Sequence, residues 1–177
     1  TNETVKFYGD DGELNGEESV LKFHEDPDGA GVYMKEDGGF YYASNSEDKP
    51  LQMTKYGGPN DWPHGGVYTI EFNAHYDPVA YFPIIEDTVD NCGGGKTPWG
   101  SWLTCEEERE GSDAFIKTDL FDATGVNQTG GLVWQTDPSG VKAAEIAMGV
   151  VPFGGNYESI AYDDTEYPPR FYTTHDW

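Results

Sequence analysis

The chain has 177 residues, and its 33 acidic and 10 basic residues give a formal net charge of -23 and a pI near 4.1. So acidic a surface repels nucleic acids and anionic membranes. No apolar run reaches the roughly 18 residues that a membrane-spanning helix needs. An aromatic content of 15% argues against disorder. The composition therefore indicates one folded, acidic domain without a transmembrane segment or a nucleic-acid partner, suited to calcium or to salty extracellular surroundings.

Residues 1–22 are rich in acids and poor in apolar anchors, so we expect a loose, solvated lead-in there. From residue 23 onward, short apolar segments alternate with turn residues. The acid- and glycine-containing run 26–31 is typical of a turn. Strands are predicted over residues 32–34, 40–46, 67–72, 79–85, 101–107, 132–136, 141–148, 156–162 and 170–174.

These strands recur with a period. Predicted strands end in acidic residues at Glu47, at Glu107 and at the pair His175-Asp176, at intervals of roughly 60 to 70 residues. Paired glycines open strands at 65–66 and again at 130–131. Several short strands per period and no convincing helix predict an all-β fold, a β-propeller with one four-stranded blade per unit. Three units fit into the chain, which is too few to close a ring.

The stretch 91–108 is the most unusual part of the sequence, because it combines three consecutive glycines, both cysteines and three successive carboxylates. Its glycine run predicts a sharp backbone corner at 91–96, ahead of the strand at 101–107. A Gly-Lys-Thr tripeptide within it could suggest a phosphate-binding loop. However, Asp90 occupies the place of the first glycine, and Pro98 prevents the helix that would have to follow. Two interpretations remain open. The stretch holds a cation with its carboxylates and a thiolate, or it is a hairpin closed by a Cys92–Cys105 disulfide.

The same stretch closely resembles the signature of the PhoX-type alkaline phosphatases, a family of bacterial and marine algal proteins. The residues that carry the resemblance are Asn-Cys-Gly-Gly-Gly-Lys-Thr-Pro-Trp-Gly-Ser-Trp-Leu-Thr-Cys-Glu-Glu over 91–107. Three further segments match in the same order, at 39–47, 154–163 and 168–176. The resemblance implies a six-bladed propeller whose central funnel holds Ca²⁺ and Fe³⁺ and hydrolyses phosphate monoesters and some diesters. It also implies export, so we expect the protein to be secreted or extracellular, periplasmic or in an organelle lumen.

Carried over residue by residue, the family pattern suggests a set of metal ligands: Glu47, Cys92, Glu107, Glu158 and Asp176. The thiolate would suit iron and the carboxylates calcium, and calcium is the more strongly indicated of the two. The sequence departs from the family at His175, where the pattern has a glutamate. We interpret this histidine as structural. Trp99 and Trp102 are expected to pack between blades.

Residues 23–177 thus correspond to about three blades of a six-bladed ring. We expect the remaining blades, which carry further ligands and a phosphate-binding arginine in the family, to come from the same polypeptide or from a second chain. By itself this chain is not expected to hydrolyse phosphate esters. The alternative function is that of a non-catalytic, calcium-stabilised propeller, a structural or interaction module in an extracellular or lumenal assembly. The altered ligand position at His175 and the missing blades motivate that alternative.

Overall fold

A computed structural model of the chain describes residues 3–8, 13–48, 65–86, 88–107, 131–147 and 156–175. Across these residues every regular element is a β-strand, which confirms the prediction of an all-β protein. Within the same ranges there is no helix with the length and apolar character to cross a membrane. The strands are β1 (Thr4–Tyr8), β2 (Leu14–Lys22), β3 (Pro27–Met34), β4 (Phe40–Ser46), β5 (Gly66–Phe72), β6 (Pro78–Glu86), β7 (Asn91–Lys96), β8 (Trp102–Glu106), β9 (Val133–Thr136), β10 (Glu145–Ile146), β11 (Tyr157–Asp163) and β12 (Arg170–His175).

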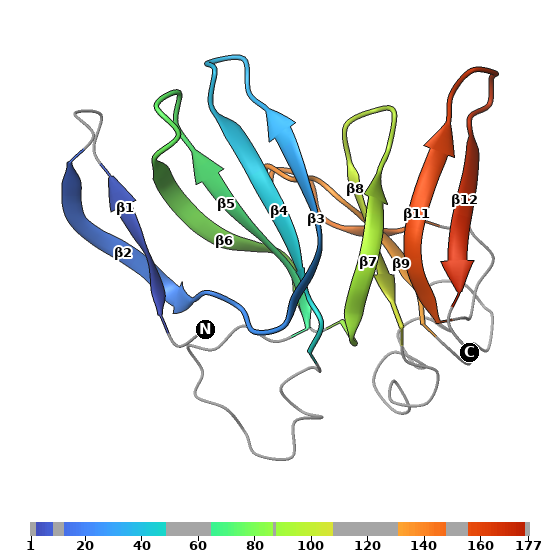
Figure 1. Cartoon of the computed structure of the whole chain (residues 1–177), viewed down its shortest axis with the longest axis horizontal. Helices are drawn as coiled ribbons and strands as arrows, with labels where there is room; N and C mark the ends of the chain where they lie inside the picture. The colour runs from blue at the N-terminus through green and yellow to red at the C-terminus, as the bar shows by residue number, and fades with distance from the viewer. Residues whose placement is uncertain are drawn as a thin grey trace.

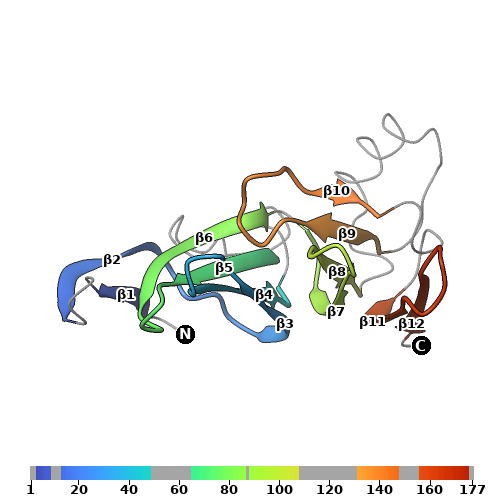
Figure 2. The same cartoon turned by 90° about the horizontal axis from the view of Figure 1, so that it is seen from above.

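The strands form antiparallel sheets in which sequence neighbours are also spatial neighbours. β3–β4–β5–β6 make one four-stranded sheet, and β7–β8–β9–β10 make a second. β1–β2 and β11–β12 are two-stranded hairpins. Figure 1 shows the sheets standing side by side, with their short turns at the upper edge, and Figure 2 shows them from above. The first strands of three successive sheets, β3, β7 and β11, are neighbours, since β7 contacts both of the others.

Glycine allows this close contact between first strands. A Cβ atom at Gly93 would overlap the carbonyl oxygen of Glu158 on β11, and one at Gly95 would overlap that of Ile160. On the other side, Gly29 of β3 lies against the backbone of Gly93. Because any larger residue would force the strands apart, the glycine run of β7 sets the spacing between sheets.

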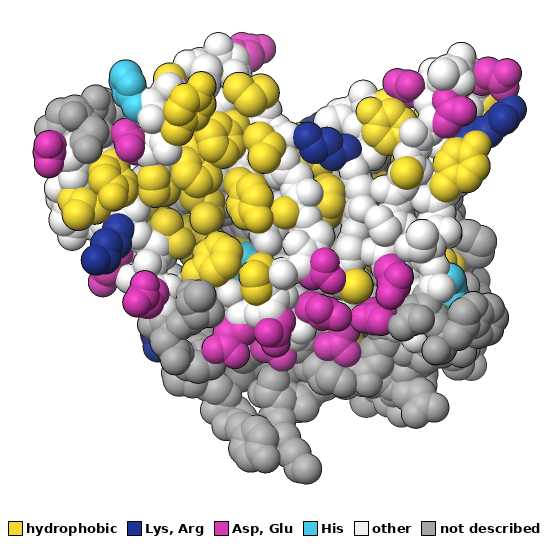
Figure 3. Space-filling view, viewed as in Figure 1, with side chains coloured by type: hydrophobic (Ala, Val, Ile, Leu, Met, Phe, Trp, Pro, Cys, Tyr) yellow, Lys and Arg dark blue, Asp and Glu magenta, His cyan; other side chains and the backbone are white. Residues whose placement is uncertain are grey.

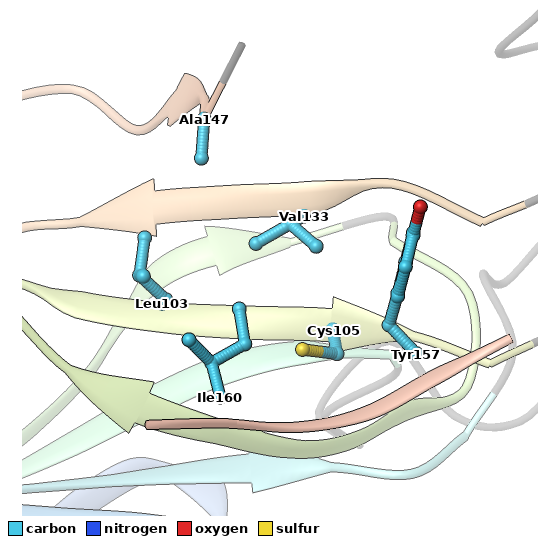
Figure 4. Packing of buried hydrophobic residues seen from close by; sticks show 6 residues of the cluster. All are labelled: Leu103, Cys105, Val133, Ala147, Tyr157 and Ile160. Atoms are coloured by element: carbon cyan, nitrogen blue, oxygen red, sulfur yellow. The ribbon is translucent and has the colours of Figure 1, made fainter. Parts of the chain in front are cut away.

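β8 lies in the middle of the apolar core, and its two faces pack against different neighbours. One face joins the β11–β12 hairpin through an apolar cluster labelled in Figure 4, consisting of Leu103, Cys105, Val133, Ala147, Tyr157 and Ile160. From the opposite face, Trp102 packs against Ala43 and Val67 of the first sheet. Trp102 therefore packs between sheets as predicted, and Trp99, although 54% exposed in the β7–β8 turn, contacts Phe171 of β12.

The predicted strands 40–46, 101–107 and 156–162 correspond closely to β4, β8 and β11. Four features differ. The segment 1–22 is solvated but not loose, since most of its described residues pair as the β1–β2 hairpin. β3 begins at Pro27, within the predicted turn, and the predicted glycine corner at 91–96 is the strand β7. Among the described residues of the predicted strand 141–148, only Glu145–Ile146 (β10) form a strand.

Candidate metal centre

A carboxylate–thiol cluster lies at the edge of the sheets where β3 and β7 begin and β4 ends. Asp28 belongs to β3, Cys92 to β7, and Glu47 follows the last residue of β4. One ligand atom from each of these three residues lies within 4.8 Å of the others. Figure 3 shows acidic side chains gathered along this lower edge. Three segments that are distant in the sequence thus place potential metal-binding atoms within a space suited to one ion.

Cys92 enters the cluster as a protonated thiol. Its Sγ atom donates a hydrogen bond of 3.0 Å to Oδ2 of Asp28. Partial burial, the bond to Asp28 and the nearby charges of Glu107 and Glu47 all raise the pKa of the thiol well above its usual range. Without a cation beside it, a thiolate would face the carboxyl groups of Asp28, Glu47 and Glu107, so the protonated form is favoured.

The surroundings of Glu47 disfavour its ionised form. Desolvation, a hydrogen bond with the carboxyl group of Glu107, and the charges of Asp28, Glu107 and Asp90 raise the pKa of Glu47 to about 7. Such mutual repulsion between carboxylates is what a bound cation would relieve. Glu107, which follows the last residue of β8, therefore also reaches the cluster.

Asn45 positions the chain that carries Cys92. Its fully buried side-chain amide donates hydrogen bonds to the carbonyl oxygens of Cys92 and Gly93, the latter at 2.8 Å. The amide oxygen accepts a bond of 2.9 Å from Nε1 of Trp102. The interface between the two sheets is therefore fixed by polar bonds next to the cluster, which sets the position of β7 relative to β4.

Backbone bonds connect the loops beneath the cluster. The amide of Glu47 donates to the carbonyl of Asp26 at 3.0 Å, and the amide of Asp90 donates to that of Asp48 at 2.9 Å. The amide of Glu107 in turn donates to the carbonyl of Asp90 at 3.0 Å. These bonds join the two segments that carry Glu47 and Glu107 through Asp90.

Glu106, the last residue of β8, has a different role from Glu107. It is 1% exposed, and its two carboxylate oxygens accept backbone bonds from Val89 at 3.1 Å and Leu132 at 2.8 Å. Burial raises its pKa to about 7, although these two bonds act in the opposite direction. Because both carboxylate oxygens already accept backbone hydrogen bonds, Glu106 stabilises the adjoining loops and is not a candidate metal ligand. β8 ends at Glu106, so Glu107, which the predicted strand 101–107 included, lies just beyond the strand.

The structure brings together part of the predicted ligand set. Glu47 and Cys92 belong to the cluster, and Glu107 is bonded to Glu47. Glu158 lies on β11, where its backbone touches Gly93, but its carboxylate is not one of the three grouped ligand atoms. Asp176 lies outside the described residues. Asp28 was missed, because its Asp-Pro-Asp-Gly context favoured a turn; a signal for it was the concentration of acids and glycines between 26 and 31.

The two cysteines have separate environments, and both are free thiols. Cys92 is half-buried at the acidic edge, and Cys105 is fully buried in the apolar cluster with Leu103 and Val133. The disulfide that the sequence left open therefore does not form in this structure. The reason is geometric: β8 directs Cys105 toward β11, while Cys92 bonds to Asp28 on β3.

Comparisons with known proteins agree with the resemblance in the sequence. Residues 63–145 match the model of the family described as alkaline phosphatase PhoX. No curated protein and no solved structure gives a significant match to the chain. The matched stretch contains β7 and β8, and with them Cys92 and Glu107. The resemblance of this chain to the PhoX-type alkaline phosphatases is thereby confirmed over residues 63–145.

Proposed function

We propose that this chain contributes part of the metal centre of a PhoX-like, metal-dependent phosphatase that hydrolyses phosphate monoesters and some diesters. The observation that carries the proposal is the grouping of Asp28, Glu47 and Cys92, with one potential ligand atom of each within 4.8 Å of the others. Two of these three residues are positions that the family pattern singles out. The match of residues 63–145 to the PhoX family supports the reaction class.

The donor set fits the metals that the resemblance implies. Carboxylate oxygens are the ligands that Ca²⁺ prefers, and thiolate sulfur is suited to iron. Asp28, Glu47 and Cys92 would bind iron through two carboxylates and a thiolate. Glu47 and Glu107 would offer oxygen ligands to calcium. Burial and mutual repulsion raise the pKa of both Glu47 and Cys92. A binding cation would therefore displace protons from these groups and neutralise the charge that they then carry.

When bound, such ions neutralise phosphate oxygens and activate water for attack at phosphorus. The residues of this chain supply position and electrostatics. The Asn45 amide holds the Cys92 carbonyl in place, and its link to the Trp102 indole fixes the cluster on a packed interface. The surplus of carboxylates at the edge would repel a phosphate ester unless cations are bound. Metal loading therefore controls access of the anionic substrate.

We further propose that the sheets are blades of a propeller in which β3, β7 and β11 are the innermost strands. Two four-stranded antiparallel sheets in sequential order, followed by a hairpin whose first strand packs on β7, support this arrangement. Residues 23–177 would then form about three blades. The resemblance implies a ring of six, completed by the same polypeptide or by a second chain, in a secreted, periplasmic or lumenal protein. Residues 1–22 would precede the first blade.

A specific observation favours a second function, that of a non-catalytic, calcium-stabilised structural or interaction module. His175, which replaces a glutamate of the family pattern, packs its imidazole edge-to-face on Tyr157, with ring centroids 5.1 Å apart. Its ring contact with Tyr157 fits the structural role expected from the sequence. Imidazole nitrogen is also a poor calcium ligand, which weakens a catalytic calcium site at this position.

Hydrolysis of p-nitrophenyl phosphate by the native protein, isolated with any chain that completes it, distinguishes the two functions. The phosphatase proposal predicts activity that EDTA abolishes and that added calcium and iron restore. Glu47→Gln should lower kcat/KM by at least about tenfold, because it removes a charged ligand. A native protein that calcium stabilises against heat but that hydrolyses no phosphate ester would establish the second function and refute the first.

A further inference from the structure

An aromatic groove lies at the edge of the sheets opposite the carboxylate–thiol cluster. It separates the β7–β8 turn from the β11–β12 turn, which project from the upper edge in Figure 1. Its volume is about 870 Å³, and its lining is dominated by prolines and aromatic rings: Pro98, Trp99, Asp164, Thr165, Glu166, Tyr167, Pro168, Pro169 and Phe171. This size lies within the range of protein ligand sites.

The rings of the groove are accessible, and one of them is held in place. Tyr167 is 97% exposed. Trp99 contacts Phe171 edge-to-face at 5.7 Å between ring centroids. Its Nε1 donates to Oε1 of Gln135 at 3.2 Å, and Gln135 is in turn bonded to Glu145 at 2.9 Å. An exposed indole that is already fixed can accept a ligand without losing further side-chain freedom.

The groove is negatively charged. Its charged lining residues are Asp164 and Glu166. Glu166 is paired with Arg170 at 2.6 Å, whereas no bond or ion pair of Asp164 to another described residue is present. The molecule as a whole adds a net charge of -23. Aromatic faces and an unpaired carboxylate both attract cations, so charge complementarity calls for a cationic ligand with apolar parts.

We propose that this groove binds an extended segment of a partner protein that is rich in proline and carries arginine or lysine. Grooves lined by aromatic rings accept polyproline segments, because these are already extended and lose little entropy on binding. Proline rings would pack on Trp99 and Tyr167, and a guanidinium or ammonium group would pair with Asp164. The groove lies away from the proposed metal centre, so this function does not depend on the phosphatase proposal.

The test is a fluorescence anisotropy titration of the full chain with labelled peptides. The probes are an alternating Pro-Arg peptide, a Pro-Glu peptide and a Gly-Arg peptide of equal length. We expect the Pro-Arg peptide to bind, the Pro-Glu peptide not to bind, and the Gly-Arg peptide to bind at least about fivefold more weakly. Tyr167→Ala, which removes an exposed ring, should weaken Pro-Arg binding by about five- to tenfold. Asp164→Asn should weaken it by a smaller factor.

Tyr76→Asn is the matched control, because Tyr76 is also a largely exposed ring in a turn but lies in the β5–β6 turn away from the groove. Its φ of 70° is one that asparagine tolerates. This variant should bind the Pro-Arg peptide as the unaltered chain does. Equal affinity for Pro-Arg and Gly-Arg, or an affinity that Tyr167→Ala does not change, would overturn the proposal by showing charge attraction alone. Equally tight binding of a neutral oligosaccharide such as maltohexaose would also overturn it.

Discussion

The acidic edge and the apolar interface around Cys105 are close together in the molecule but are built on opposite principles. At the edge, Asp28, Glu47 and Cys92 are held by polar bonds, and their mutual repulsion disfavours the charged forms. In the interface, Leu103 and Cys105 pack against β11 without charge. The difference teaches that the interface supplies stability, whereas the edge is less stable because it keeps carboxyl groups and a thiol close together.

The glycine spacing underlies both regions, and changing it should have the largest effect. We expect Gly93→Ala to lower the free energy of unfolding by about 3 kcal/mol or more, because the new Cβ would overlap the Glu158 carbonyl. Urea denaturation measures the change. Gly16→Ala is the control: it has open space, so only its φ of 81° is strained, at about 1 kcal/mol. Equal losses for the two variants would contradict backbone contact between β7 and β11.

Asn45 connects the edge to the core, so its loss should affect both. Asn45→Leu leaves the Trp102 indole and the Cys92 and Gly93 carbonyls without this partner. We expect stability to fall by about 2–3 kcal/mol and metal affinity to fall with it. Calorimetry of the metal-free and metal-loaded protein would separate the two effects. Unchanged metal affinity in a folded variant would show that Asn45 does not position the cluster.

The response to pH should distinguish core from edge. His24 is fully buried, with its ring nitrogens 3.0 Å from the Tyr81 hydroxyl and 3.1 Å from that of Ser44, and burial lowers its pKa to about 4. Its contribution to stability is therefore full above the ordinary histidine pKa of 6.5 and is lost as pH falls toward 4. Glu47, whose pKa is raised, responds in the opposite sense: its contribution is present at low pH and is lost as pH rises through about 7.

Thermal unfolding at pH 7 and pH 5 tests this difference. Acidification should remove about 2 kcal/mol of stability through His24 in the unaltered chain but not in His24→Gln. The opposing gain from Glu47 and Glu106 is shared by both proteins, so their changes should differ by about that amount. His75→Gln, a change at an exposed histidine in the β5–β6 turn, should behave like the unaltered chain. If His24→Gln and the unaltered chain lose the same stability between the two pH values, the buried neutral histidine is not the acid-sensitive element.

Substituting the cysteines should have the smallest effects on stability. These substitutions should also separate the role of the apolar interface from that of the acidic edge most clearly. Cys105→Ser places a hydroxyl in the apolar cluster and should reduce stability by about 1 kcal/mol while leaving metal affinity unchanged. Cys92→Ser should leave stability unchanged but reduce the metal affinity. In the unfolded, metal-free protein a thiol reagent should label both cysteines without added reductant. Labelling of neither cysteine before reduction would restore the disulfide interpretation.

The sequence predicted the fold correctly where local residue pattern decides the structure. It failed where contacts between distant backbone segments decide it. Short runs rich in aromatic and apolar residues correctly indicated β4 and β5, which are buried on both faces over part of their length. Glycine suggested turns at 26–31 and 91–96, where it instead permits strands to pack closely. Local sequence cannot reveal this, because the neighbouring strand is far away in the chain. The place of Asp28 in the cluster was missed for the same reason, whereas the family motif singled out Glu47 and Cys92, which the structure places in one cluster.

The central claim is that the carboxylate–thiol cluster holds metal, and metal analysis of the native protein tests it most directly. Elemental analysis should find calcium, together with iron, at close to whole-number ratios to the protein. The double variant Glu47→Gln/Cys92→Ala should lose the iron while remaining folded, whereas Cys105→Ala should keep it. Metal retained at full stoichiometry in the folded double variant, or a native protein that contains no metal, would contradict the claim.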